Sequence, residues 1–130
     1  MDTQEIIDGN RIIAHTMGYE ESGALVNYFN TPNGLELVHF HEDYSWLMKA
    51  VKHIITKYGA NFSYNNEQFM LTDSETKIEV EVQPDKEVYC AWKCVCKYLI
   101  QKNREHENIR RNIYFLLYCV FVVDVFQMDN

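Results

Sequence analysis

Two histidines and two cysteines have the side chains and the spacing to hold a metal ion. His39 and His41 lie two residues apart, so both rings would point to the same face of an extended strand. Cys90 and Cys94 lie four residues apart, which places both thiols on one face of a helix. Imidazole nitrogens and thiolate sulfurs are common zinc ligands. One alternative is therefore a small metal-dependent or ligand-binding protein, against ordinary packing of the same four side chains.

The remaining reactive side chains do not form a recognisable catalytic set. Cys96 would point about 160° away from Cys94 on a helix, so the two thiols cannot bind the same ion. Glu42 and Asp43 are adjacent where a helix is expected to begin, and helix capping accounts for acidic residues there. The sequence contains no glycine-rich phosphate loop, no G-x-S-x-G segment and no H-E-x-x-H segment. We therefore expect no catalytic residues, no enzymatic activity, no metal and no cofactor.

Trp46 is the side chain that most suggests a surface for a protein partner. It falls on the polar side of the helix expected over 44–58, near His53 and Lys57 and close in sequence to His41. An indole in this position is either covered by another part of the fold or left exposed as a contact. Tryptophans are enriched at binding hot spots. The sequence thus predicts a partner-binding surface at these four residues, with coverage by the preceding loop or the C-terminal segment as the alternative.

The apolar spacing predicts helices together with short strands. The clearest helix runs from Tyr44 to Tyr58, with Asp43 as its N-cap and Gly59 at its end. The other expected elements are a helix over 11–17 capped by Asn10 after a turn at Asp8-Gly9, extended pieces over 24–29 and 35–40, strands over 61–65, 68–72 and 77–83, and a helix over 86–102. We expect an α+β fold, in which a small antiparallel sheet of three to four strands packs against two main helices. A short N-terminal helix and an apolar C-terminal element complete it.

The C-terminal part of the chain changes character twice. Residues 103–112 are strongly charged, whereas residues 113–126 are apolar on every side. Their length and even coverage favour a buried helix over a strand. Only eleven apolar residues precede Asp124, and a membrane span takes about 20, so we expect no membrane partner. An apolar surface of this kind can instead supply a homodimer interface.

The charge of the chain is acidic and uneven. The formal net charge is −7, which argues against nucleic acid as a partner because phosphate binding depends on lysine and arginine. Residues 1–85 hold five basic and fourteen acidic side chains, but residues 86–111 hold seven basic and three acidic ones. A weak nucleic-acid-binding face over 86–111 is therefore a further alternative to a solvated helix surface.

The sequence predicts one intracellular domain spanning 1–130. The first twenty residues lack the basic head and apolar stretch of a secretory signal. Three of the four cysteines are crowded into seven residues, which is a poor framework for disulfides and indicates reduced thiols. These features predict a cytoplasmic location.

The segment from His39 to Val51 resembles a known sequence pattern. It is similar to the Y-H-x-S-W-D-W-L-M-x-V-V stretch of small uncharacterised proteins encoded by bacteriophages and prophages of gut bacteria. The matching residues are His41, Trp46, Leu47, Met48 and Val51, and Tyr44 replaces the first tryptophan. Two further pieces are similar to the opening and the ending of these proteins, namely Arg11–Ala14 with Met17-Gly18, and Lys77–Glu79 with Ala91–Val95.

The resemblance covers about half of the chain and implies an origin more than a mechanism. This sequence departs from the family by inserting Val80–Val88 and by continuing past residue 103, which makes residues 103–130 a C-terminal extension. The family carries no binding residues that transfer to this chain. The resemblance implies a phage or prophage protein in the cytoplasm of a bacterial host. Our leading hypothesis is a non-enzymatic accessory protein that binds a host or phage protein.

Overall fold

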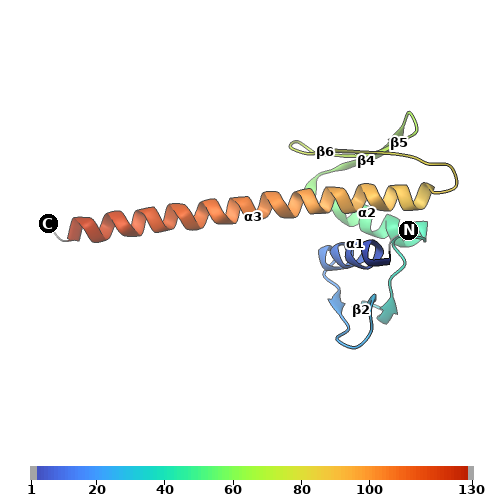
Figure 1. The fold of residues 1–130 in the computed structure, drawn as a ribbon, viewed down its shortest axis with the longest axis horizontal. Coiled ribbons are helices and arrows are strands. Elements are labelled where there is room, and N and C mark those ends of the chain that lie inside the picture. Colours follow the sequence, from blue (N-terminus) through green and yellow to red (C-terminus); the bar gives the residue numbers. More distant parts are fainter. Residues whose placement is uncertain (1–2, 129–130) are drawn as a thin grey trace. The chain divides into compact units, whose positions relative to one another are not determined.

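The computed structural model describes the backbone of residues 3–128 and the side chains of residues 3–107 and 109–119. The chain divides into two compact units, Met1–Ile100 and Gln101–Asn130, and each is described by itself. The structure confirms the predicted α+β class, with three helices and two small antiparallel sheets (Figure 1).

The first unit contains six short strands in two separate sheets. The strands are β1 (Glu20–Glu21), β2 (Tyr28–Thr31), β3 (Gly34–Leu37), β4 (Asn61–Asn65), β5 (Gln68–Thr72) and β6 (Lys77–Glu81). Neighbouring strands pair in the order β1-β2-β3 and β4-β5-β6. The predicted sheet is therefore present as β4–β6. The β1–β3 sheet, by contrast, forms in a region that we expected to be mostly loop.

Local turn chemistry accounts for the β4–β5 hairpin. Asn66 and Glu67 form its two-residue turn, and both have positive φ angles, 53° and 61°. Positive φ at both central residues gives the turn a twist that matches that of the flanking strands. In the next pair, Phe69 lies opposite Val80 and Leu71 opposite Ile78, so apolar side chains meet across the sheet.

Helix α2 (Tyr44–Tyr58) has the predicted bounds and both predicted caps. The Asp43 carboxylate accepts hydrogen bonds from the backbone N–H groups of Ser45 and Trp46. The hydrogen bond from the Ser45 side chain, followed by these backbone bonds, lowers the pKa of Asp43. Gly59 ends the helix in the left-handed conformation, with φ 66°, which glycine adopts without the steric cost of a side chain.

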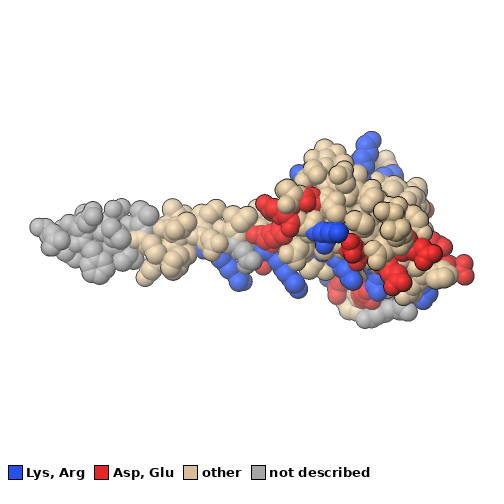
Figure 2. Space-filling view, turned by 90° about the horizontal axis from the view of Figure 1, so that it is seen from above, with Lys and Arg blue, Asp and Glu red and all other residues tan. Residues whose placement is uncertain are grey.

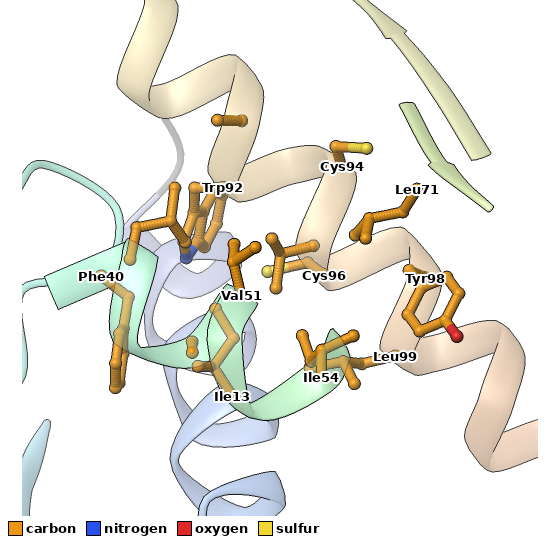
Figure 3. Packing of buried hydrophobic residues seen from close by; sticks show 14 of the residues in the cluster. Ile13, Phe40, Val51, Ile54, Leu71, Trp92, Cys94, Cys96, Tyr98 and Leu99 are labelled. Atoms are coloured by element: carbon orange, nitrogen blue, oxygen red, sulfur yellow. The ribbon is translucent and has the colours of Figure 1, made fainter. Parts of the chain in front are cut away.

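The core of the first unit lies around the beginning of α3 (Glu87–Met128). Sheet β4–β6 lies on one side of these first turns, and α2 and α1 (Thr3–Thr16) lie on the other (Figure 1). Figure 3 shows side chains from all these elements converging, with Ile54 beside Leu99 and with Cys94 directed toward Leu71. The rings of Tyr58 and Tyr98 meet edge to face, with their centroids 5.8 Å apart.

Helix α1 is longer than the sequence pattern indicated. We expected Asp8-Gly9 to form a turn and Asn10 to cap a short helix, but all three residues lie inside α1. This prediction was wrong because both Gly9 and Asn10 are used for packing: Gly9 lies against Trp92, and Asn10 is fully buried. Tertiary contacts thus override the local preference of these residues for turns and caps.

The extended piece predicted over 35–40 is also shorter than expected. Strand β3 ends at Leu37, and the chain then turns, with the backbone N–H groups of Glu42 and Asp43 both donating to the His39 carbonyl. His39 and His41 therefore lie on a loop and not on one face of a strand. The geometric basis of the predicted histidine pair is absent.

The second unit is the continuation of α3 from Gln101 to Met128. Residues 113–126 form a helix, as predicted, but the expectation that this helix is buried was wrong for the residues whose side chains are described. The large apolar side chains from Ile113 to Tyr118 are each more than half exposed, from 51% to 67%. In the part of the chain that the structure describes, no helix has both the length and the apolar character needed to cross a membrane.

Candidate functional site

A buried polar network joins α1, α3 and the loop before α2. The Trp92 indole N–H donates to Asn10 Oδ1 over 2.9 Å, and Asn10 Nδ2 lies 3.0 Å from His41 Nδ1. The rings of His41 and Trp92 are in edge contact at 6.3 Å. Asn10 is fully buried, and Trp92 is 1% exposed. One amide side chain therefore connects residues that are 31 and 82 positions away in the sequence.

This network fixes the protonation state of His41. An indole nitrogen only donates, so the Asn10 oxygen must face Trp92 and its NH₂ group must donate to His41. His41 Nδ1 is consequently the acceptor, and the proton of the neutral ring is on Nε2, which lies 3.6 Å from the Glu42 carboxylate. Burial lowers the pKa of His41, although Glu42 opposes this shift. A neutral, hydrogen-bonded His41 acts as a structural element of the fold.

The predicted partner-binding residues do not form one continuous patch. Trp46 is half-buried, because His39 and Phe40 contact its ring edge to face at 5.9 and 5.5 Å. The loop before the helix therefore covers part of the indole, as the alternative interpretation held. The Lys49 ammonium lies 5.4 Å from the centre of the same ring. Only part of the Trp46 ring is left to a partner.

His53 and Lys57 lie farther along α2. They are seven and eleven residues beyond Trp46, or about two and three helical turns. Lys57 is exposed and places its ammonium 5.3 Å from the centre of the Tyr58 ring, whereas His53 is half-buried. Glu42 connects His41 to the residues around Trp46. Its carboxylate lies 3.6 Å from His41 Nε2 and 2.8 Å from Nδ1 of His39, whose ring contacts the indole. A common binding role for the four predicted residues stays a prediction.

The structure does not gather the proposed metal ligands. The Cys94 thiol faces the carbonyl oxygens of Phe69 and Ile78 at 3.7 and 3.9 Å, on the side of sheet β4–β6. Cys90 accepts a hydrogen bond from the Gln83 backbone at 3.5 Å, while His41 faces α1. Among the described residues, no group of three or more histidine, cysteine, aspartate or glutamate side chains is placed to hold a metal ion.

A groove of about 470 Å³ lies between α1 and α3 in the first unit. Ten residues line it, namely Gln4, Glu5, Asp8, Gly9 and Ile12 from α1, and Trp92, Lys93, Cys96, Lys97 and Ile100 from α3. The two sets span nine residues each, so the groove extends over about two helical turns, or about 12 Å.

Gly9 brings the two helices close together at the floor of the groove. A Cβ atom at this position would lie 2.3 Å from Trp92 Cζ2 and 2.9 Å from Cys96 Sγ. The absence of a side chain thus allows the indole to pack directly on the α1 backbone. Ile12 and Ile100 complete an apolar floor, and burial raises the pKa of the Cys96 thiol, which keeps it uncharged.

Charged side chains of opposite sign form the two edges of the groove. Glu5 and Asp8 lie on the α1 edge, and Lys93 and Lys97 lie on the α3 edge. The Lys93 ammonium lies 5.2 Å from the centre of the Tyr89 ring. Burial is the main cause that raises the pKa of Tyr89; nearby Lys93 lowers this pKa and Glu5 raises it. The site therefore combines an apolar floor with one acidic and one basic edge.

The groove resembles a contact surface more than a reaction centre. Among the described side chains, no buried nitrogen or oxygen atom lacks a hydrogen-bond partner, so no unsatisfied polar group points into the floor. A small-molecule site usually carries a few convergent polar groups that orient the ligand. Here the polar groups stand at the edges, as they do where an amphipathic helix docks in a groove.

Sequence reasoning missed Gly9, Asn10 and Trp92 as one unit. The residues are far apart in the sequence, and Asp8-Gly9-Asn10 has the composition of a turn. The available signal was the amphipathic pattern around them: Ile6, Ile12 and Ile13 continue a helical stripe on either side of the glycine.

Comparison of the chain with protein-family models, with curated proteins and with solved structures finds no match. The likeness to phage and prophage proteins therefore depends on the three sequence segments alone.

Proposed function

We propose that this chain is a non-enzymatic accessory protein that acts by binding another protein, of host or phage origin. The observation that carries the proposal is the α1–α3 groove, with its apolar floor and its oppositely charged edges. An amphipathic helix presents this chemistry to a groove, with apolar side chains inward and charges along both flanks. The resemblance to small phage and prophage proteins supports the origin.

The chemistry of the nucleophiles and the histidine also favours binding over catalysis. Burial raises the pKa of Cys94 to about 12, and burial likewise raises the pKa of Cys96. Both thiols are therefore protonated at neutral pH, whereas a nucleophilic cysteine reacts as the thiolate. His41 is already bound to Asn10 through the nitrogen that would otherwise accept a proton.

The test is affinity capture from bacterial lysate with matched variants. The double variant Lys93→Glu/Lys97→Glu reverses the basic edge of the groove, and Lys52→Glu/Lys77→Glu makes the same charge change at two exposed positions outside it. We expect a protein that the wild type and the control double variant retain and the groove double variant loses. Equal retention by all three forms would contradict the assignment to the groove.

The same experiment distinguishes binding at Trp46 from binding in the groove. If the predicted surface at Trp46 binds the partner, Trp46→Ala reduces capture while the charge reversal at the groove has no effect. Because His39 and Phe40 pack against this indole, the variant is first checked for cooperative unfolding.

The second unit favours a second binding function, association with another copy of the chain. Six consecutive large apolar residues, 113–118, are each more than half exposed. A contiguous exposed apolar surface of this kind marks an interaction site in a soluble protein. We propose a homodimer through the apolar C-terminal segment. Light scattering of the full-length chain and of a form ending at residue 108 tests it. The same number of chains per particle in both forms would contradict it.

A nucleic-acid role has weaker support. Of the seven basic residues over 86–111, Lys86, Lys93 and Lys97 belong to the first unit, and the other four belong to the second. Figure 2 shows acidic and basic side chains interspersed on the face in view. Retention on DNA or RNA at low salt, lost as salt is raised, would favour this alternative.

A further inference from the structure

One row of aliphatic residues runs along α3 in the second unit. Ile109, Ile113, Leu116, Val120 and Val123 recur at alternating steps of four and three residues. This is the spacing of the core positions of a coiled coil, in which the first and fourth residues of each seven face the partner helix. The row covers fifteen residues, or about 22 Å of helix. We call it the aliphatic seam.

The seam is distinguished from the rest of the helix surface by what it lacks. The charged residues Arg110, Arg111 and Asp124 fall outside it. So do the aromatic residues 114, 115 and 118, whose bulky rings fit poorly between two closely packed helices. Any other row at this spacing meets an arginine, an asparagine or Asp124. The seam is thus the row that a helical partner can bury over its full length.

The residue types favour two strands at the centre of the seam. Ile113 and Val120 occupy one kind of core position and both are branched at Cβ, and Leu116 occupies the other kind between them, a combination that favours a parallel dimer. At the two ends of the seam, Ile109 and Val123 stand at the same kind of position as Leu116, and branched residues there fit larger assemblies equally well.

A charged pair beside the seam fits the same arrangement. In a parallel coiled coil, the residue before one core position faces the residue five places later on the partner helix. Extended by one step toward the N-terminus, the row places His106 at the core position seven residues before Ile113. Glu105 comes directly before this position and Arg110 lies five places after Glu105, so each dimer would contain the pair twice. Glu105 lies 3.3 Å from Lys102 on its own helix, and Arg110 is exposed. Opposite charges thus meet when two copies align in parallel and in register.

We propose that two copies of this chain associate as a parallel coiled coil through the aliphatic seam, with Glu105 of each copy facing Arg110 of the other. The inference rests on the homodimer proposed above and specifies its seam, its direction and its register. The partner is a second copy because the apolar row and the charged pair are complementary to themselves.

Sedimentation equilibrium of the full-length chain tests the seam with a matched pair of variants. Leu116→Lys places a charge in the seam, and Tyr118→Lys places the same charge about 160° away on the helix. We expect a concentration-dependent dimer whose dissociation constant rises at least about a hundredfold in Leu116→Lys and less than about threefold in Tyr118→Lys. Circular dichroism checks that both variants keep their helix.

The outcomes separate the seam from the homodimer itself. A wild-type chain that stays monomeric at about 200 μM, some two hundred times a micromolar dissociation constant, overturns both. A dimer that Tyr118→Lys weakens as much as Leu116→Lys overturns the seam and leaves the homodimer in place.

Charge exchange tests the direction of the two helices. Glu105→Arg and Arg110→Glu should each weaken the dimer by about three- to tenfold, because like charges then face each other. The double variant restores opposite charges and should recover the wild-type dissociation constant within about twofold. If the loss of binding free energy in the double variant equals the sum of the losses in the two single variants, the parallel register is wrong.

Discussion

Replacement of Asn10 by leucine should destabilise the first unit strongly. The side chain is fully buried and binds two groups, the Trp92 indole N–H at 2.9 Å and His41 Nδ1 at 3.0 Å. Leucine has the same number of side-chain heavy atoms and the same branching, so the variant removes both hydrogen bonds without opening a cavity. Each buried polar group that loses its partner costs about 1–3 kcal/mol.

The two orphaned groups should not contribute equally. Trp92 is 1% exposed, so its N–H finds no water and the cost there lies at the upper end of the range. The side chain of His41 is 16% exposed, so water can reach the ring and the cost is lower. Allowing for the gain from burying an apolar side chain, we expect the free energy of unfolding to fall by about 2–4 kcal/mol.

The assay is urea unfolding of wild type and Asn10→Leu, followed by tryptophan fluorescence and circular dichroism. Trp92→Phe and the double variant complete a mutant cycle, which isolates the Asn10–Trp92 interaction. Because the hydrogen bond is absent from either single variant, the double variant should be more stable than the sum of the two losses indicates. A loss below about 0.5 kcal/mol in Asn10→Leu, the range of ordinary surface substitutions, would refute the reasoning.

Three further predictions follow from other residues. Because burial lowers the pKa of His41, the unfolded chain binds the proton more readily, and stability should fall as the pH drops below about 6.5. Unfolding free energies at pH 7.5 and 5.5 measure this, and His41→Gln should remove that part of the difference. Gly9→Ala should lower the melting temperature despite the helix preference of alanine, because its Cβ would meet Trp92 at 2.3 Å, and Gly23→Ala, with no atom within 4 Å, should not. Asp43→Ala should cost about 1 kcal/mol in urea unfolding through loss of the N-cap, and full stability of that variant would contradict the assigned cap.

Elements with strong local signals were predictable from the sequence, and elements that depend on distant contacts were not. Helix α2 has an apolar stripe, a carboxylate cap and a terminal glycine, so its bounds follow from local chemistry alone. The β4–β6 sheet follows from alternating residues and polar turns. The β1–β3 sheet has strands of two to four residues, too short to produce a recognisable alternation.

The candidate site was less accessible to sequence reasoning. The groove requires Gly9 to face Trp92, and nothing near either residue indicates the other, because the contact depends on how α1 packs on α3. The histidine pair failed for the same reason, since the chain turns after Leu37 and the two rings take different neighbours. For Trp46, the sequence left open whether another element covers the indole or a partner contacts it, and its contacts with His39 and Phe40 depend on the folded loop.

The complete burial of Cys94 provides a chemical probe for opening of the first unit. A thiol reagent in solvent can reach the Cys94 sulfur only when α3 separates from the β4–β6 sheet, so the labelling rate of Cys94 reports how often this opening occurs. Cys119, in the second unit, is partly exposed and should be labelled without any opening of the structure. The same chain thus contains a buried thiol that reports opening and a partly exposed thiol that serves as an internal reference. Mass spectrometry can follow the labelling of both under native conditions without denaturant.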